Sequence, residues 1–427
     1  MNQPLQPTDS AFALLFALLL LASLAIAGLA LVNTGLGRTR SAAQSLLGSV
    51  IILAVSIIWF AAVGSIFAGA SHSAVFTAAG KPWDWLGLGP WLLGGSRTAA
   101  PVDQLRLLFQ LLAAGMAGLI PWGAGADRLR LSAGGLIGGM MAIVIFPLAA
   151  HWIWSGWLAQ LGTNFGLGAG FLDPAGAGAI HVVGGLSALA VIWIAGPRKG
   201  KFPREGLATA MPAHNSTYVL FGCLVATVGW LALNETGALL WLQTPAASLP
   251  LIGTAVNTLL AASGASLATL TVTRFRFGKP DASLCVNGWL AGLVTSSACA
   301  PVVSPLAALF TGVVAGIFTP LLVEVLELAI SIDDPTGAIA VHGAAGLWGL
   351  FAAGLFAPQH GEFLAQMVGI AALLGFFLPL VYGMFALANR VLPFRVDPDG
   401  ERLGMDLHEL GGAAYPEFVI HRDDSYR

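Results

Sequence analysis

The stretch DPAGAGAIHVVGGLSAL at residues 173–189 returns as DPTGAIAVHGAAGLWGL at residues 334–350. Each copy places a histidine eight residues after its Asp, His181 in the first and His342 in the second. At a helical rise of about 1.5 Å per residue, each histidine lies roughly 12 Å from the start of its helix. The repeat therefore predicts two related helices that carry their histidines at the same depth.

The composition around this repeat is that of a membrane protein. Of the 427 residues, 57% are apolar and 9% are charged, whereas soluble domains carry about a quarter charged residues. The formal net charge of −2 argues against a nucleic-acid-binding role. We therefore expect an all-α polytopic protein that lies in the lipid bilayer.

Apolar runs of about 20 residues, the length that crosses a bilayer, predict eleven transmembrane helices. The predicted spans are residues 10–34, 43–69, 104–125, 133–157, 174–196, 214–235, 250–273, 284–300, 303–330, 336–357 and 364–389. No Lys or Arg precedes the first run, so we expect a retained span there rather than a signal peptide.

Basic residues predict how these spans are oriented. Lys and Arg gather after the first, third, fifth, seventh and last spans, and the intervening short loops are nearly free of them. Cytoplasmic loops carry the excess of Lys and Arg. We therefore expect the N-terminus outside, the C-terminus in the cytoplasm, and the cell inner (plasma) membrane as the location.

The distance between the two copies predicts their relative orientation. From 181 to 342 the shift is 161 residues, or five predicted spans, so the two copies enter the membrane from opposite sides. Such inverted repeats place a shared substrate path near the bilayer midplane. We predict repeats at about 10–196 and 214–357 and a further helix at 364–389. These would form a membrane domain of residues 1–393, followed by a cytoplasmic tail at 394–427.

The residues inside the repeat have a structural and a functional interpretation. Asp173 and Asp334 suit helix caps, because Asp accepts a backbone N–H and Pro tolerates the first helical turn. Glycines such as Gly185 and Gly343 allow close helix approach. One intramembrane histidine can simply join helices, but two at equal depth favour a shared site, since buried ionisable groups usually mark a pathway. Imidazole can also donate, accept and pass a proton.

Further motifs follow in a fixed order along the chain. They are DRLR at 127–130, GPRKGKF at 196–202, MPAHN at 211–215, VGWLALN at 228–234, AVNT at 255–258, CVNGWLAGLV at 285–294 and RVDPDGERLGMDLHELGGAAY at 395–415. Together with the twin histidines, they make the chain resemble the ammonium transporter (Amt/Mep/Rh) family, Amt branch, over its whole length. The resemblance implies ammonium or ammonia as substrate, a pore in each subunit of a homotrimer, no cofactor and no enzymatic activity.

The resemblance also assigns roles to individual residues. Trp154 would recruit ammonium in an outer vestibule through a cation–π contact of about 0.5–2 kcal/mol. The ion would lose its proton before passage, because hydrocarbon penalises an unpaired ion heavily. His181 and His342 would line the narrow pore. For Trp152 and Trp157 we expect an interfacial aromatic belt.

Two carboxylates lie near this predicted vestibule. By resemblance, Asp173 would stabilise the vestibule backbone without touching the substrate. Glu235 stands near the outer end of the sixth predicted span. It would either draw cations toward the mouth or be an ordinary solvated charge at a helix end.

The chain departs from the family pattern at the gate above the pore. The family usually stacks two phenylalanines there, and the matching positions are Ala113, in FQLLA at 109–113, and Leu233, in LNETG at 233–237. Gly237 replaces the vestibule serine. Phe109 lies one helical turn from Ala113 on the same face and could fill the gap. We expect an outer constriction that is rebuilt from other side chains or is wider.

These departures keep other functions open. The chain could be an ammonium-binding sensor or a poorly conducting family member. A metalloenzyme built on the histidine pair is disfavoured, because neither repeat supplies a third ligand at helical spacing; ordinary hydrogen bonds suffice for His151 and His214. In the tail, Leu410-Gly411-Gly412 stands where family members that bind a PII-type signalling protein carry His-Gly-Glu. The chain thus departs from the family at this motif. Because the rest of the tail resembles the family's, we still expect a PII-type signalling protein as a partner of the tail.

Overall fold

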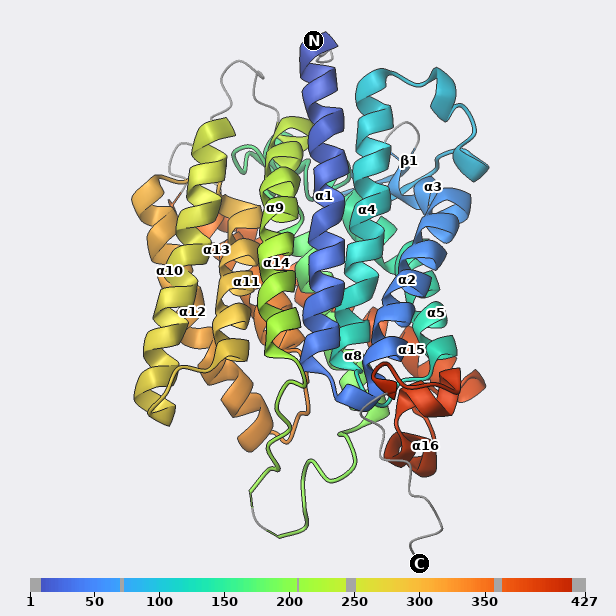
Figure 1. Cartoon of the computed structure of the whole chain (residues 1–427). Helices are drawn as coiled ribbons and strands as arrows, with labels where there is room; N and C mark the ends of the chain where they lie inside the picture. The colour runs from blue at the N-terminus through green and yellow to red at the C-terminus, as the bar shows by residue number, and fades with distance from the viewer. Residues whose placement is uncertain (1–8, 70–72, 206, 243–250, 357–362, 417–427) are drawn as a thin grey trace, which may run out of the picture.

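The computed structural model describes residues 9–69, 73–205, 207–242, 251–356 and 363–416. Long helices stand side by side in a bundle (Figure 1). Eleven helices within these ranges are long and apolar enough to cross a membrane. Each predicted span coincides with one of them, which confirms the predicted fold class.

The spans consist of α1 (Asp9–Leu36), α2 (Ala42–Trp59) with η2 (Phe60–Gly64) and α3 (Ser65–Ala68), α4 (Pro101–Ala124), α5 (Leu131–Met140) with η5 (Met141–Ile145) and α6 (Phe146–Trp154), η6 (Ala177–Val182) with α8 (Val183–Ala195), α9 (Ser216–Trp241), α10 (Leu251–Phe277), α11 (Ala282–Cys299), α12 (Pro305–Leu328), η8 (Ile339–Ala344) with α13 (Ala345–Phe356), and α14 (Phe363–Ala372) with η10 (Leu373–Phe377) and α15 (Leu378–Val391).

Shorter elements connect these spans. They are η1 (Thr39–Ser41), β1 (Ser73–Ala78), β2 (Lys81–Gly87), η3 (Trp91–Leu93), η4 (Ser96–Thr98), α7 (Leu161–Phe165), α16 (Pro398–Leu403) and η11 (Asp406–Leu410). One boundary difference matters for the site: α9 continues to Trp241, past the predicted end of that span at 235.

Within each half of the bundle, helices at the same positions of the predicted repeat pack against each other. In the first half α2 packs against α5 and α4 against α8; in the second, α10 packs against α12 and α11 against α13. The first helix of each predicted repeat, α1 and α9, lie side by side (Figure 1). Two repeats of five spans would produce this pairing. Their inverted orientation and the placing of the termini across the membrane stay predictions.

A β-hairpin covers one end of the bundle. Its strands β1 and β2 pair antiparallel, and Trp85 of β2 packs edge-on against Trp152 at 4.9 Å between ring centroids. Trp152 is 1% exposed and Trp157 is 9% exposed, so the prediction of an interfacial belt for these two residues is wrong. The belt prediction considered only lipid as their neighbour, whereas a segment far away in sequence buries both rings. Asp84 of the hairpin also meets His151 Nε2 at 2.8 Å.

The tail docks at the opposite end of the bundle (Figure 1). The first N–H groups of a helix lack partners inside the helix, and tail carboxylates supply acceptors for two spans. Asp406 accepts from the backbone N of Gln44 at 2.8 Å, at the start of α2. Glu409 accepts from the backbone N of Leu131 at 2.6 Å, at the start of α5. The tail therefore caps two membrane spans.

Replacing Asp406 by Ala removes one of these caps. We expect a loss of roughly 0.5–2 kcal/mol of folding free energy, the usual effect of losing an N-cap acceptor. The midpoint of thermal unfolding of the detergent-solubilised protein should fall accordingly. Asp399→Ala is the matched control, because the Asp399 side chain is 85% exposed. Equal midpoints for the two variants would show that the tail does not stabilise α2.

Candidate functional site

The two repeat histidines meet inside the bundle. His181 lies on the π-helical turn η6 and His342 on the π-helical turn η8, and both are buried. Their Nδ1 atoms are 3.2 Å apart, and the rings lie 5.2 Å apart between centroids at an interplanar angle of 20°. The structure thus brings together two side chains that are 161 residues apart in sequence.

A hydrogen bond between two Nδ1 atoms fixes where the protons of the pair reside. One Nδ1 must donate and the other must accept. In a pair of neutral imidazoles, the ring that donates through Nδ1 keeps a lone pair on Nε2, and the ring that accepts carries its proton on Nε2. The two Nε2 atoms therefore present one donor and one acceptor. His181 Nε2 is buried without a hydrogen-bond partner among the described residues.

Aspartates cap both histidine-bearing turns. Asp173 Oδ2 accepts from the backbone N of Gly178 and of Ala179, each at 2.9 Å. Asp334 Oδ2 accepts from the backbone N of Ile339 at 2.8 Å. These contacts confirm the capping predicted from the repeat. Each cap fixes the helix start and so the depth of the histidine that follows.

Glycines provide the backbone shape that the pair requires. Gly176 and Gly337 occupy the same position of the repeat, and both are left-handed, at φ +86° and +69°, a conformation that glycine adopts without steric cost. Further along, a Cβ atom on Gly185 would lie 2.4 Å from the backbone N of Gly343. Only glycine at 185 allows the two helices to approach closely enough for their imidazoles to bond.

Trp230 packs against one histidine of the pair. It stacks on His181 at 5.0 Å and 14°, and its Nε1 donates to Ser297 Oγ at 3.0 Å. Ser297 in turn donates to Asn234 Oδ1 at 3.0 Å. Sequence reasoning gave VGWLALN no role, and so missed these residues. The available signal was a Trp and an Asn one helical turn apart in an otherwise apolar span.

A cavity of about 570 Å³ lies at the hairpin end of the bundle, the end predicted to face outside, and is called the outer cavity. Gln110, Trp154 and Trp241 are among its lining residues. Trp154 Nε1 donates to the backbone O of Asp173 at 2.8 Å. The predicted recruitment residue is therefore tied to the residue that caps the first histidine turn.

The two positions predicted for the gate are both buried. Ala113 and Leu233 are 1% and 2% exposed. Trp241 stacks face to face on Trp154 at 4.9 Å and 10°, and Phe109 meets the two indoles edge-on at 5.5 and 6.3 Å. Whether the constriction is rebuilt from these side chains or is wider stays a prediction. Sequence reasoning missed Trp241 because it ended that span at 235.

Gly237 and Glu235 of α9 both lie in closely packed surroundings. A Cβ atom on Gly237 would lie 2.3 Å from the backbone O of Pro174, so a serine there would require this loop to move. Glu235 is 8% exposed and lies inside α9, so the prediction of a solvated charge at a helix end is wrong. The span continues past it and buries it. Whether Glu235 draws cations stays a prediction.

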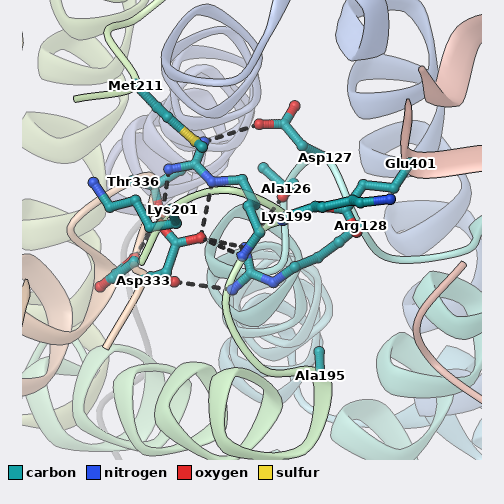
Figure 2. Close-up of polar contacts among 12 residues, drawn as sticks. Ala126, Asp127, Arg128, Ala195, Lys199, Lys201, Met211, Asp333, Thr336 and Glu401 are labelled. Atoms are coloured by element: carbon teal, nitrogen blue, oxygen red, sulfur yellow. Dashed lines mark hydrogen bonds and ion pairs between the residues drawn. The ribbon is translucent and has the colours of Figure 1, made fainter. Parts of the chain in front are cut away.

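At the tail end of the bundle, a buried ion-pair cluster joins the two histidine helices (Figure 2). Arg198 follows α8, and its Nε and Nη2 donate to the two carboxylate oxygens of Asp333 at 2.9 and 2.8 Å. Asp333 precedes Asp334, the cap of η8. Arg198 Nη1 also meets Asp127 Oδ2 at 3.0 Å, and Arg128 Nη1 lies 3.6 Å from Asp333.

Comparison with known proteins agrees with this architecture. The sequence matches the model of the Ammonium Transporter Family over residues 11–415. The chain belongs to the ammonium transporter family. Among its relatives, ammonium transporter Amt2 of Archaeoglobus fulgidus is 31% identical over 98% of this chain and 90% of the relative. Amt2 of Haloferax mediterranei is 31% identical over 92% of this chain and 87% of the relative.

Solved structures show the same fold for this ammonium transporter family member. A protein described as a Sensor Amt Protein has a TM-score of 0.83 at 24% identity, over 93% of this chain and 97% of that one. Candida albicans Mep2 has a TM-score of 0.79 at 24% identity, over 97% and 92%. With its eleven apolar helices, the chain is a multi-pass plasma-membrane protein of a family of transporters, not enzymes, and family membership supports ammonium transport.

His151 and His214 of this family member have ordinary hydrogen-bond partners. His151 pairs with Asp84, and His214 contacts Gly37 O at 3.2 Å and the Tyr415 hydroxyl at 3.3 Å. Within the described ranges, no three His, Cys, Asp or Glu side chains gather in a way that could hold a metal ion.

The ion-pair cluster has a defined electrostatic state. Burial by itself raises the pKa of the Asp333 carboxyl, but the hydrogen bonds from Arg198 and the charges of Arg128 and Arg198 lower this pKa to about 2. Burial lowers the pKa of Arg198, and its bonds and charge attraction to Asp333 and Asp127 more than offset this and raise it above its usual range. Both groups stay charged across the physiological range.

Because the pKa of Asp333 is low, the contribution of this carboxyl to the stability of this transporter family member depends on pH only in acid. A carboxyl whose pKa is lower in the folded state stabilises fully above its unfolded value, 3.8, and loses this effect as the pH falls toward about 2. Asp333→Asn should cost about 3 kcal/mol, as expected for one lost partner of a buried ion pair. The gap in unfolding midpoint from wild type should be constant between about pH 8 and 5 and shrink below about pH 4. A gap in unfolding midpoint that changes between about pH 8 and 5 would contradict the low pKa of Asp333.

Proposed function

We propose that this chain conducts ammonium across the membrane along a path that passes Trp154 and the His181–His342 pair, and that the ion gives up its proton before it crosses. The observation that carries the proposal is the Nδ1–Nδ1 contact of 3.2 Å between two buried histidines at matching positions of the repeat. Two ionisable side chains buried at such a position in a membrane protein usually mark a pathway.

The chemistry of the pair favours ammonia over ammonium as the species that passes it. The two Nε2 atoms offer one donor and one acceptor, and ammonia has both a lone pair and N–H groups to match them. Ammonium has only donors, so it would leave the donating Nε2–H without an acceptor. A bare cation in this buried surrounding also carries a large desolvation penalty. The accepting Nε2 could also pass on the proton that the ion leaves behind.

The outer cavity would supply the recruitment step. Trp154 lines it, and an indole face attracts a cation by about 0.5–2 kcal/mol. Asp173 holds Trp154 through its backbone O and holds the histidine turn through its carboxylate, so it would act on the substrate only indirectly. Ala113, Leu233 and Gly237 would shape the passage from this cavity toward the pair.

The test is the transient current on adding an ammonium pulse to proteoliposomes. We expect a current for the wild type and a loss of at least about tenfold for His181→Ala/His342→Ala, because the pair passes protons. His408→Ala, which changes an exposed histidine of the tail, is the matched control and should conduct like the wild type. An unchanged current in the double variant would overturn the role of the pair.

A second candidate function is an ammonium sensor or a poorly conducting transporter. The observation in its favour is that Trp241 covers one face of Trp154, so the outer path is occupied by a ring. The same preparation separates the two functions. Saturable ammonium binding by calorimetry without any wild-type current would support the sensor and exclude conduction.

The proposal extends to partners. A homotrimer and a PII-type signalling protein at the tail follow from the family pattern, and the tail surface includes Asp399 and Arg402, 85% and 75% exposed. Truncation at 395 would also remove the caps of α2 and α5. A pull-down of PII by the wild type and by Asp399→Ala/Arg402→Ala is therefore the cleaner test. We expect capture by the wild type to be weakened in the variant; no capture by the wild type would exclude this partner.

A further inference from the structure

A guanidinium and two indoles form a stack in the wall of the outer cavity. The Arg106 guanidinium carbon lies 5.2 Å from the ring centroid of Trp241, and Trp241 stacks on Trp154 at 4.9 Å. All three residues line the cavity. An arginine of the protein thus contacts the kind of aromatic face that attracts a cation.

Arg106 is held in this place by the end of α9. Its Nε and Nη2 donate to the backbone O of Leu240 at 3.3 and 3.1 Å, and its Nη1 donates to Asp103 Oδ1 at 3.2 Å. The last carbonyls of a helix lack partners within the helix and carry partial negative charge, so a guanidinium is stabilised there. The same side chain therefore binds both the end of α9 and the ring of its last residue, Trp241.

The two indoles are anchored differently. Trp154 is fixed by the hydrogen bond from its Nε1 to Asp173 O at 2.8 Å. The Nε1 of Trp241 is buried and has no acceptor in the described part of the chain. Trp241 is thus held by ring contacts and the guanidinium alone, and it stands at the last residue of its helix. It can swing away without breaking a hydrogen bond of its own.

Trp241 lies where a side chain could close the passage from the outer cavity into the bundle interior. Gln104 and Gln110 of α4 line the cavity, whereas Ala113, the next residue along this face, is 1% exposed and does not line it. Residues three and four apart share a helix face, so Ala113 continues the line of Phe109 and Gln110 toward the bundle interior. With Ala at 113 and Leu at 233, Trp241 supplies the aromatic surface that those positions lack.

We propose that Trp241 is the outer gate of this chain and that Arg106 latches it over Trp154. The guanidinium occupies one face of Trp241, and Trp241 covers one face of Trp154, so an incoming ammonium ion reaches that face of Trp154 only after Arg106 releases Trp241 and Trp241 moves away. Arg106 lowers the affinity of the vestibule for ammonium, and Trp241 limits the size of the species that enters. This proposal deepens the transport function and rests on it.

The transport test compares four variants by ammonium current and methylammonium uptake in proteoliposomes. Arg106→Met keeps the side-chain stem without its charge and should lower the half-saturating ammonium concentration about threefold, whereas Arg106→Lys, which restores a cation, should remain close to wild type. Trp241→Ala should raise the methylammonium-to-ammonium ratio several-fold. Trp91→Ala is the matched control, because the Trp91 residue is 67% exposed. Unchanged half-saturation in Arg106→Met and an unchanged ratio in Trp241→Ala would overturn the gate.

A second measurement does not depend on transport. A charged thiol reagent added from outside should modify Ala113→Cys slowly, and about tenfold faster when Trp241→Ala removes one stacked ring. Gln104→Cys, on the exposed wall of the cavity, should react equally in both backgrounds. The chain without an added cysteine controls for the native thiols. Equal rates at Ala113→Cys with and without Trp241 would refute the gate.

Together the two measurements separate the proposals. Faster modification of Ala113→Cys in the Trp241→Ala background without any wild-type current would retain the gate and reject conduction. A wild-type current that depends on the histidine pair, combined with equal modification rates, would retain conduction and reject the gate. Size-exclusion profiles identify any variant that fails to fold, and Trp241→Phe then replaces Trp241→Ala, with a smaller expected acceleration.

Discussion

The hydrogen bond between His181 and His342 is the contact on which the rest of the architecture depends. Two helices from opposite halves of the chain form this contact of 3.2 Å, and their backbones pass close together where Gly185 meets Gly343. Glycine at 185 permits this approach, and the caps at Asp173 and Asp334 set how deep each histidine lies. A larger residue at the crossing would separate the imidazoles.

Charge is kept away from that contact. The imidazole pair can remain neutral and still offer a donor and an acceptor. The buried ion pairs of Arg198, Asp333 and Asp127 lie instead beyond the ends of the histidine helices, where they join segments distant in sequence. A buried ion pair contributes little net stability by itself, but loss of either partner is costly. The cluster therefore fixes relative position more than it adds stability.

Aromatic rings gather at the outer cavity, near the positions where the chain departs from the predicted family pattern. Ala113 and Leu233 stand where aromatic residues are usual, yet the neighbourhood holds three stacked or edge-on rings, Phe109, Trp154 and Trp241. One of these comes from the last residue of a helix rather than from its middle.

The sequence by itself determined the eleven spans, the twin-histidine repeat and its aspartate caps, because hydrophobic length and helix capping are local properties that a linear pattern records. Other features depended on contacts between distant segments: the hairpin that buries Trp152, the tail carboxylates that cap α2 and α5, the Trp230 stack and the stacking of Trp241 on Trp154. Only the tertiary structure could decide these, since a side chain's partner is set by which helices pack together and not by its neighbours in the chain.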